Sequence, residues 1–540
     1  MTGSEALAYG ALDAGVQFVT GYPGSPATAT FEALLRLAGE EVRLEWATNE
    51  KSAFDAAFGA SLARVRSLLC LKGVGLNVAL DSLMVCNLAG GDGGFVILSG
   101  DDPGGWGSQN EEDSRLLAAA AEVPLLEPTS VGQARSLMQE AFDLSERYRV
   151  PVVVRFTRAL AVERAALTPV RARTPSRPPA QFDRRPERYN VLPIHVVEFH
   201  QRLQATLDEV QARFEHSPLN AEDGYGRQGV IAVGYAYQKL LQVLKQGARA
   251  PLRILHLSTL HPLPAARIGV FLRQVDAALV LEESAPYVET QVQALAQRAG
   301  LNRPIYGRSS GHLPHAGELF TPHIALALTA LPGEQSWPTF TEPERPMPSR
   351  EPLCDGCPYI PLLETLQAVM ERHGGRNAFV VTGETGCMVR AQLPPWEILD
   401  MKYGMGASIG LAAGLARAGI PQQIVALSGD SALLHSGLPE LIDAVQAGVR
   451  LLVIVLANET TALSGGQPHP ATAHDARGER RPPLDLATLI HAAGVESVRV
   501  VDPEDRPSTD AALEAGLAAS GVAVVIAQRA CPRWIEEPRS

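Results

Sequence analysis

The sequence predicts an α/β protein with three doubly wound domains. Short apolar runs that suit buried parallel strands alternate with helical patterns over residues 1–165, again over 227–335 and again over 353–540. Such alternation is typical of a parallel sheet covered by helices. Two proline-rich stretches interrupt it: residues 166–226, where an arginine- and proline-rich linker leads into a helix, and a second linker at 336–352.

Loops that follow the predicted strands are the first candidates for ligand contacts. In the first domain these loops are rich in glycine, proline or acidic residues, and open parallel sheets bind ligands at the carboxyl ends of their strands. Ordinary turn chemistry is the alternative for any single loop. The strands are predicted at Gln17–Thr20, Ser67–Leu71, Gly94–Ser99 and Val150–Phe156, and in the middle domain at Gly229–Gly234, Leu252–Leu255 and Ala277–Glu283.

The arginines of the first linker have two interpretations. The stretch from Arg171 to Arg188 mixes arginine with proline, which predicts a solvated linker between domains, although the arginines could instead grip an anionic ligand. A helix with apolar residues at helical spacing is predicted to follow over residues 191–215.

Composition narrows the class of protein. The chain has 540 residues, of which 46% are hydrophobic and 20% charged, and this balance is typical of a globular protein. Its net charge of −12 argues against a nucleic-acid surface. No secretory signal is expected at the start, and no apolar run approaches the roughly 18 residues of a membrane span. Six cysteines in so long a chain are no disulfide framework, so we expect the reducing cytoplasm.

The most informative stretch lies in the last domain. The sequence predicts a strand at Gln423–Ser428, a helix at Leu434–Val445 and a strand at Arg450–Leu456. Gly429-Asp430-Ser431 follows the first strand and Asn458-Glu459-Thr460 follows the second, with 26 residues between them. Both polar groups therefore fall just past carboxyl ends of strands, where an α/β sheet binds its ligand.

These residue types suit a hard divalent cation. Mg²⁺ prefers oxygen ligands, and the Asp430 carboxylate, the Asn458 amide and the Thr460 carbonyl can supply them, with a diphosphate completing the octahedron. The pattern resembles the thiamine diphosphate motif, in which Gly-Asp-Gly is followed at a similar distance by Asn; here Ser431 replaces the second glycine. The alternative is an ordinary βαβ turn with a surface aspartate and a loop asparagine.

A second carboxylate suits thiamine chemistry. Activation of thiamine needs a carboxyl group against N1′ of the aminopyrimidine, and Glu50 lies at the start of a predicted small-residue helix, Ala53–Ala63. A solvated carboxylate in the first turn of a helix, favoured by the helix dipole, is the alternative for Glu50.

Read together, these stretches resemble the alpha subunits of indolepyruvate:ferredoxin oxidoreductases, within the 2-oxoacid:acceptor oxidoreductase superfamily. The resemblance covers nearly the whole chain in order. It rests on residues 21–26, 49–51, 72–79, 101–104, 108–111, 282–286 with Glu289, and 458–470.

The resemblance implies a role for each domain. Residues 1–165 would be the pyrimidine-binding domain, 227–335 a transketolase-C-terminal-like domain and 353–540 the diphosphate-binding domain, with the cofactor between the first and the last, across two copies of the chain. Glu50 would contact the aminopyrimidine, and Ser25, in the place of a family threonine, would face the substrate carboxylate. The motif residues Gly429, Asp430, Ser431, Asn458 and Thr460 would hold the metal and the diphosphate.

Four of the six cysteines suggest an iron–sulfur cluster. The pair Cys354 and Cys357 is too few for a tetrahedral site, but Cys387 and Cys531 bring the number to the four that a 4Fe-4S cluster needs. Their order resembles that of the superfamily's thiamine-proximal cluster. Buried thiols beside the cofactor are the alternative, and Cys70 and Cys86 are predicted to be small core residues.

The sequence departs from the family at three places. Tyr359 replaces the histidine expected after Cys-Pro, and Glu384-Thr385 replaces Asp-Ile before Gly-Cys387. Cys357 and Tyr359 should both lie near the cofactor. Relatives continue into a ferredoxin-like segment, whereas this sequence ends nine residues after Cys531.

The resemblance implies thiamine-dependent oxidative decarboxylation of an arylpyruvate-like 2-oxo acid to an acyl-coenzyme A, in which thiamine acts as the electron sink. Expected partners are a gamma-type (beta) subunit and a ferredoxin or flavoprotein that accepts electrons, with a homodimer of this chain inside a hetero-oligomer. No nucleic acid or membrane is expected. The rival hypothesis is a non-oxidative thiamine-dependent decarboxylase or lyase, and the third is an inactive scaffold subunit.

Overall fold

The computed structural model divides into two compact units, Met1–Pro346 and Met347–Ser540. Most of the linker 336–352 and part of the arginine-rich linker, including Arg171, Arg173 and Arg177, lie outside the described residues. The structure describes residues 1–167, 179–246, 251–331 and 352–534.

The first sheet has seven strands in the order β10-β5-β6-β4-β3-β1-β2, all parallel except β10. The predicted strands of the first domain correspond to β1, β3, β4 and β6, with bounds displaced by one or two residues. The strands are β1 Phe18–Gly21, β2 Arg43–Trp46, β3 Ser67–Lys72, β4 Phe95–Asp101, β5 Leu125–Leu126, β6 Val152–Thr157 and β10 Thr259–His261.

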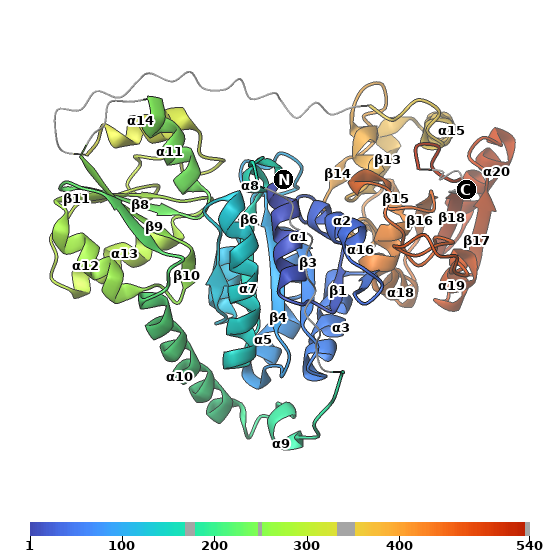
Figure 1. Ribbon diagram of the computed structural model, residues 1–540. Helices are drawn as coiled ribbons and strands as arrows, with labels where there is room; N and C mark the ends of the chain where they lie inside the picture. The colour runs from blue at the N-terminus through green and yellow to red at the C-terminus, as the bar shows by residue number, and fades with distance from the viewer. Residues whose placement is uncertain (168–178, 247–250, 332–351, 535–540) are drawn as a thin grey trace. The chain divides into compact units, whose positions relative to one another are not determined.

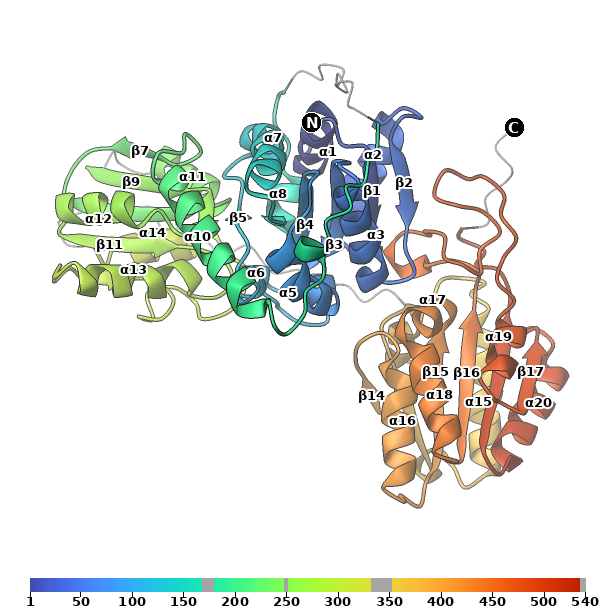
Figure 2. The same ribbon diagram turned by 90° about the horizontal axis from the view of Figure 1, so that it is seen from below.

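Helices cover both faces of this sheet (Figures 1 and 2). Alternate residues of β3 enter two different cores, with Leu68 and Cys70 facing α1, α2 and α7 and with Leu69 and Leu71 facing α3 and α5. This is the two-sided burial expected of a parallel strand. The helices are α1 Gly3–Asp13, α2 Ala27–Leu37, α3 Glu50–Leu62, α4 Gly73–Val78, α5 Leu80–Ala89, α6 Ser114–Ala120, α7 Val131–Tyr148 and α8 Arg158–Val162.

The second sheet has the order β12-β11-β8-β9-β7. Its strands are β7 Ala221–Gly224, β8 Gln228–Val233, β9 Leu252–Leu257, β11 Ala277–Leu281 and β12 Ile305–Tyr306. Its helices, and the two that lead into it, are α9 Pro186–Tyr189, α10 Val196–Glu215, α11 Ala236–Gln246, α12 Ala265–Gln274, α13 Tyr287–Arg298 and α14 Thr321–Leu328.

Two strands differ from the sequence prediction. Residues 221–224, expected in the linker segment, form the antiparallel edge strand β7, and β10 leaves the middle segment to pair with β5 of the first sheet. Neither strand is an apolar run, since β7 reads Ala-Glu-Asp-Gly and β10 reads Thr-Leu-His. Pairing with neighbouring strands, and not a pattern in the sequence, therefore creates both strands.

The third sheet has six parallel strands in the order β14-β13-β15-β16-β18-β17. The strands are β13 Phe379–Gly383, β14 Met401–Lys402, β15 Gln423–Gly429, β16 Leu451–Ala457, β17 Ser497–Val501 and β18 Val522–Gln528. The helices are α15 Tyr359–Arg372, α16 Ala407–Arg417, α17 Asp430–Ala432, α18 Leu438–Gln446, α19 Leu486–Ala492 and α20 Arg506–Ala518. Short 3₁₀ turns lie at Arg376–Ala378, Cys387–Gln392 and Ala462–Ser464.

The helix predicted at Leu434–Val445 begins differently. Leu433–Gly437 is a π-helical turn, and regular α-helix begins only at Leu438, next to Pro439. Proline lacks the amide proton that would continue the α-helical hydrogen-bond ladder backwards, so it fits at the first turn of a helix.

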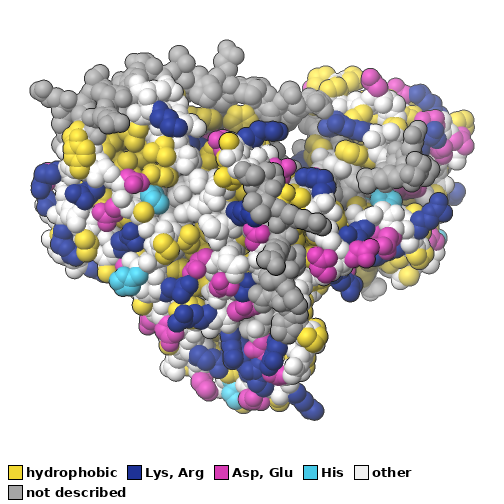
Figure 3. Space-filling view, viewed as in Figure 1, with side chains coloured by type: hydrophobic (Ala, Val, Ile, Leu, Met, Phe, Trp, Pro, Cys, Tyr) yellow, Lys and Arg dark blue, Asp and Glu magenta, His cyan; other side chains and the backbone are white. Residues whose placement is uncertain are grey.

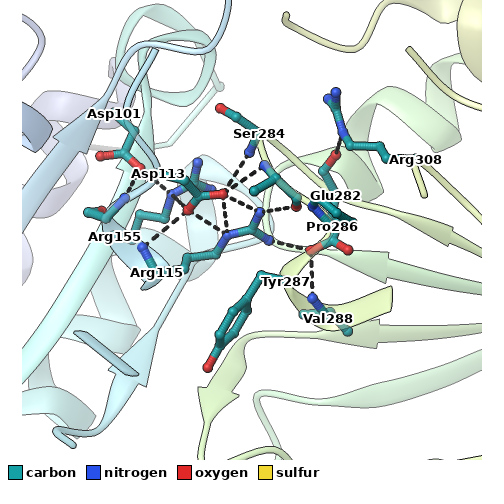
Figure 4. Close-up of polar contacts among 12 residues, drawn as sticks. Asp101, Asp113, Arg115, Arg155, Glu282, Ser284, Pro286, Tyr287, Val288 and Arg308 are labelled. Atoms are coloured by element: carbon teal, nitrogen blue, oxygen red, sulfur yellow. Dashed lines mark hydrogen bonds and ion pairs between the residues drawn. The ribbon is translucent and has the colours of Figure 1, made fainter. Parts of the chain in front are cut away.

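A buried network of charges joins the first and second sheets within the first unit (Figure 4). Arg115 donates to Asp113 at 2.6 Å and to Glu282 at 2.7 Å, and none of the three side chains is more than 3% exposed. Asp113 also accepts the backbone amides of Ser284 and Ala285. Burial would raise the pKa of Asp113, but the Arg115 and Arg155 guanidinium groups lower it below its usual range. The arginines therefore offset the cost of burying Asp113, whereas burial still raises the pKa of Glu282 above its usual range.

Charge is mixed on the drawn face of the first unit. On the face drawn in Figure 3, basic and acidic side chains of the first unit are interspersed. Within the described part of the chain, no helix combines the length and apolar composition needed to cross a membrane.

Replacing Arg115 with alanine should strongly destabilise the first unit. The change leaves the Glu282 carboxylate buried without its cation and leaves Asp113 with only the Arg155 cation, 3.9 Å away. Removing one partner of a buried ion pair typically costs about 3–5 kcal/mol. The matched control is Arg227→Ala, whose ion pair with Asp276 is exposed to solvent and should contribute little to stability. The loss of stability in each variant is measured by urea unfolding, followed through hydrogen exchange in the strands of the second sheet. Equal shifts in the two variants would contradict the compensation.

Candidate functional site

The two motif groups of the last domain meet at one edge of the third sheet. Parallel pairing aligns Gly429 of β15 with Leu456 of β16, so the chain leaves both strands at the same edge. Asp430 begins α17, and Asn458 follows β16. The backbone amide of Glu459 donates to Asp430 Oδ2 at 2.8 Å, which fixes the two groups side by side.

The turn after β16 has an uncommon backbone shape. Glu459 has φ of 62°, in the left-handed region that non-glycine residues rarely adopt. Its side chain points to solvent, while Asn458 and Thr460 on either side are buried. Asn458 Oδ1 accepts the Thr460 amide at 3.2 Å. The turn thus directs the amide of Glu459 inward, toward Asp430, with Asn458 and Thr460 buried on either side of it.

This edge fits an oxygen-ligated cation. Asp430 provides a carboxylate that is 3% exposed, and Asn458 and Thr460 provide amide and carbonyl oxygens. Among the described residues no three His, Cys, Asp or Glu side chains form a metal-ligand set, so Mg²⁺ here would depend on neutral oxygens and on phosphate. His469, to which sequence reasoning gave no role, lies with Nε2 3.3 Å from Asp430 Oδ2. That nitrogen is buried and makes no hydrogen bond.

Glu384 is a functional candidate that sequence reasoning noted only as a departure. It follows β13 and is fully buried, and its carboxylate accepts Ser428 Oγ at 2.6 Å, the Gly429 amide at 3.1 Å and Ser408 Oγ at 3.1 Å. Burial raises its pKa to about 7, although the hydrogen bonds lower it in part. Glu384 therefore holds the residue before Asp430 in place.

The four cysteines predicted to bind a cluster line one pocket of about 710 Å³. They come from three separate stretches of the last domain. Gly356, at φ of 70°, allows the turn in which the Cys357 amide donates to the Cys354 carbonyl at 3.0 Å. Burial raises the pKa of Cys357 to about 11 and that of Cys387 to about 12. The structure brings the thiols together without forming a set of metal ligands, so the cluster stays a prediction.

Tyr359 links this pocket to the sheet edge that carries Asp430, Asn458 and Thr460, here called the metal edge. It is the first residue of α15, is buried, and lines the pocket beside Cys357. Its hydroxyl donates to the Leu456 carbonyl at 3.2 Å, two residues before Asn458. Burial raises the pKa of Tyr359 well above its ordinary value, so the phenol stays protonated. Direct contact of Cys357 and Tyr359 with a cofactor remains a prediction.

In the first unit the two predicted site residues lie at carboxyl ends of neighbouring strands. Glu50 begins α3, after β2, and is 7% exposed. A methyl group on Gly75 would lie 2.8 Å from Glu50 Oε1, so the absence of a side chain at Gly75 lets α4 pass the carboxylate without displacing it. Asn49 caps the helix by accepting the Ser52 amide at 2.8 Å. Ser25, in the loop after β1, is exposed, and its contact with the substrate stays a prediction.

Comparison with known protein families shows that two parts of the chain match thiamine-binding domains. The C-terminal domain of thiamine pyrophosphate enzymes, which binds the cofactor, matches residues 384–527. The thiamine diphosphate-binding domain of pyruvate flavodoxin/ferredoxin oxidoreductases matches residues 9–223. The first match contains the Asp430 edge and the second contains Glu50, so both parts of the predicted cofactor site lie inside thiamine-binding domains. Fold and site thus define a thiamine diphosphate-dependent oxidoreductase subunit.

Relatives narrow the class. Indolepyruvate oxidoreductase subunit IorA of Archaeoglobus fulgidus is 34% identical over 98% of this chain and 86% of the relative. The IorA subunit of Pyrococcus abyssi is 33% identical over 98% of this chain and 85% of the relative. A solved 2-oxoglutarate:ferredoxin oxidoreductase from Magnetococcus marinus aligns with a TM-score of 0.48 and 17% identity, covering 61% of this chain and 64% of that one. The chain belongs to the family of IorA subunits, the alpha subunits of 2-oxoacid:acceptor oxidoreductases, which confirms the resemblance seen in the sequence.

Replacing Glu384 with glutamine should change how stability depends on pH. A pKa raised from 4.5 to about 7 means that the native state keeps a proton that the unfolded state loses, so the free energy of unfolding falls as pH rises through this window, by roughly 3 kcal/mol. Glu384→Gln should remove that part of the slope. Urea unfolding of the cofactor-free chain between pH 5 and pH 8 measures it, with exposed Glu371→Gln as control. Identical slopes in all three proteins would show that Glu384 does not titrate here.

Proposed function

We propose that this chain binds thiamine diphosphate and Mg²⁺ and oxidatively decarboxylates an arylpyruvate-like 2-oxo acid, with coenzyme A collecting the acyl group. The observation that carries the proposal is the hydrogen bond from the Glu459 amide to Asp430, because it joins the two halves of a diphosphate motif at one sheet edge. The names of the IorA relatives support the substrate class.

Residues of the chain would divide the work as follows. Asp430, Asn458 and the Thr460 carbonyl would hold Mg²⁺ against the diphosphate, with Gly429 and Ser431 shaping the turn. Glu50 would hydrogen-bond to N1′ of the aminopyrimidine and hold the proton that activation needs, and its near-complete burial supports this role. The Ser25 hydroxyl would contact the substrate carboxylate. Bound thiamine supplies the electron sink for loss of CO₂.

Electrons would leave through one 4Fe-4S cluster on Cys354, Cys357, Cys387 and Cys531. Their common pocket supports this, and the Arg390 guanidinium, which donates to Cys354 Sγ at 3.6 Å, would offset the negative charge of four thiolates. The cluster would pass electrons to a ferredoxin or flavoprotein. The chain would act in the cytoplasm as a homodimer within a hetero-oligomer that includes a gamma-type (beta) subunit.

A non-oxidative decarboxylase is the second candidate. Anaerobic incubation with a panel of 2-oxo acids, coenzyme A and a one-electron dye, with and without the partner subunit, separates the two. Dye reduction with acyl-coenzyme A formation is expected. Aldehyde and CO₂ released without dye reduction in either condition would establish the non-oxidative reaction instead.

Asp430→Ala should abolish retention of thiamine diphosphate while leaving the fold intact, because it removes the acidic ligand of the metal edge. Asp443→Ala is the matched control, since Asp443 lies on α18 of the same sheet and its exposed side chain pairs with Arg417. Calorimetric titration with thiamine diphosphate and Mg²⁺ measures both variants. Wild-type affinity in Asp430→Ala would refute the metal assignment.

Glu50→Gln should bind the cofactor but turn over at least about 100-fold more slowly, the scale for losing a positioned proton-transfer group. An amide keeps the size of the side chain and cannot give up the proton. Exchange of the thiazolium C2 proton into D₂O, followed by NMR, isolates the activation step. Glu45→Gln, on β2, is the control and should exchange at the wild-type rate. A wild-type exchange rate in Glu50→Gln would show that another group activates the cofactor.

A further inference from the structure

The segment Cys531–Trp534 lies against the loop that follows β16. The pairing of β18 with β16 continues beyond the strands, because the Arg529 amide donates to the Ala457 carbonyl at 3.0 Å. The Cys531 amide then donates to the carbonyl of Asn458 at 3.1 Å. The chain turns back at once, since the Trp534 amide donates to the Cys531 carbonyl at 3.1 Å. The segment therefore contacts Asn458, a predicted ligand of Mg²⁺, at its first residue, and contacts the loop after Thr460 at its last.

The Trp534 indole is fitted to the loop 461–467. Its Nε1 donates to the Ala462 carbonyl at 3.2 Å. Its ring lies so close to Gly466 that an added methyl group there would meet ring carbon Cδ2 at 2.5 Å. Gly466 also has φ of 79°, which favours glycine. The ring is 38% exposed, and its inner side contacts the loop through the close approach at Gly466 and the hydrogen bond to Ala462.

This loop begins directly after Thr460 and is hydrogen-bonded both to Thr460 and to the turn next to Asp430. It is closed by the Thr461 amide, which donates to the Gln467 carbonyl at 2.9 Å, and by the Gly466 amide, which donates to Thr461 at 3.1 Å. Thr460 Oγ1 donates to the same Gln467 carbonyl at 3.3 Å. Thr461 Oγ1 lies 3.1 Å from Ser431 Oγ, in the turn next to Asp430. Movement of the loop would therefore displace Thr460 relative to Asp430.

We propose that Trp534 is a positioning residue for the metal edge: its indole holds the loop 461–467 in the shape that places the oxygens of Asn458 and Thr460 opposite Asp430. This inference rests on the proposed function, because it assumes that Mg²⁺ and a diphosphate bind at that edge. Trp534 touches neither of them. It acts through Ala462 and Gly466, as residues behind metal ligands generally do when they fix ligand orientation.

The test is the Mg²⁺ dependence of thiamine diphosphate binding, measured by calorimetry on the full chain. Trp534→Ala should raise the Mg²⁺ concentration needed for half-maximal binding about tenfold or more, the scale for losing support behind a metal ligand. Trp534→Phe keeps a ring against Gly466 but loses the donor to Ala462, so it should give a smaller shift. Trp396→Phe is the control and should behave as wild type, because Trp396 is partly buried against the core of the same unit.

A double-mutant cycle tests whether the contact between the Trp534 ring and Gly466 causes the change in Mg²⁺ requirement. Gly466→Ala should also raise the Mg²⁺ requirement, because its methyl group pushes the indole away. Combined with Trp534→Ala it should add less than the sum of the two shifts, since the ring that the methyl group would meet is gone. Fully additive shifts would contradict the direct contact as the cause.

The possible failures separate. A wild-type Mg²⁺ requirement in Trp534→Ala overturns this inference and leaves the proposed function standing. A lower thermal midpoint of the cofactor-free Trp534→Ala chain, with an unchanged Mg²⁺ requirement, shows a purely structural role and also overturns it. A wild-type chain that binds no thiamine diphosphate at any Mg²⁺ concentration overturns the inference and the proposed function together.

Discussion

The site of the last domain depends on the parallel pairing of β15 with β16. Because the register sets Gly429 beside Leu456, Asp430 and the turn at Asn458 leave the sheet at one edge, and a single amide hydrogen bond joins them. Other contacts then use this fixed edge. The Tyr359 hydroxyl meets the carbonyl of Leu456, and the Cys531 amide meets that of Asn458. The thiol pocket is thereby built onto the same strand end as the metal edge.

Much of this could be predicted from the sequence, because the signals are local. The apolar runs of the parallel strands gave their positions within one or two residues, and the Gly-Asp-Ser and Asn-Glu-Thr groups predicted ligand residues at the strand ends. The family resemblance was confirmed for the same reason, since it rested on short stretches spread along nearly the whole chain.

What the sequence missed depends on contacts between distant residues. Glu384 is defined by Ser408 and Ser428, which lie 24 and 44 residues further on, and neither serine is part of a motif. Likewise β10 pairs across segments more than a hundred residues apart, at β5. The position of the Trp534 ring depends on its contacts with both Gly466 and Ala462. No periodicity or spacing in the sequence encodes such a meeting.

The pocket lined by the four cysteines also combines a local sequence signal with contacts between distant residues. Four cysteines could be counted from the sequence, and their convergence on one pocket is a property of the fold. Burial raises the pKa of Cys357 and Cys387, so both stay protonated at neutral pH in the thiol state. Because metals and clusters bind the thiolate, cluster insertion would have to release protons and draw the sulfurs together.

The most direct test of the central claim replaces Mg²⁺ with Mn²⁺ and follows binding by electron paramagnetic resonance. The account predicts that the signal of free Mn²⁺ disappears at one ion per chain only when thiamine diphosphate is present, and that the bound ion shows ³¹P hyperfine coupling. Asp430→Asn should abolish both. Mn²⁺ that binds equally well without thiamine diphosphate, or that keeps its ³¹P coupling in Asp430→Asn, would contradict a diphosphate-bridged metal at the edge of β15 and β16.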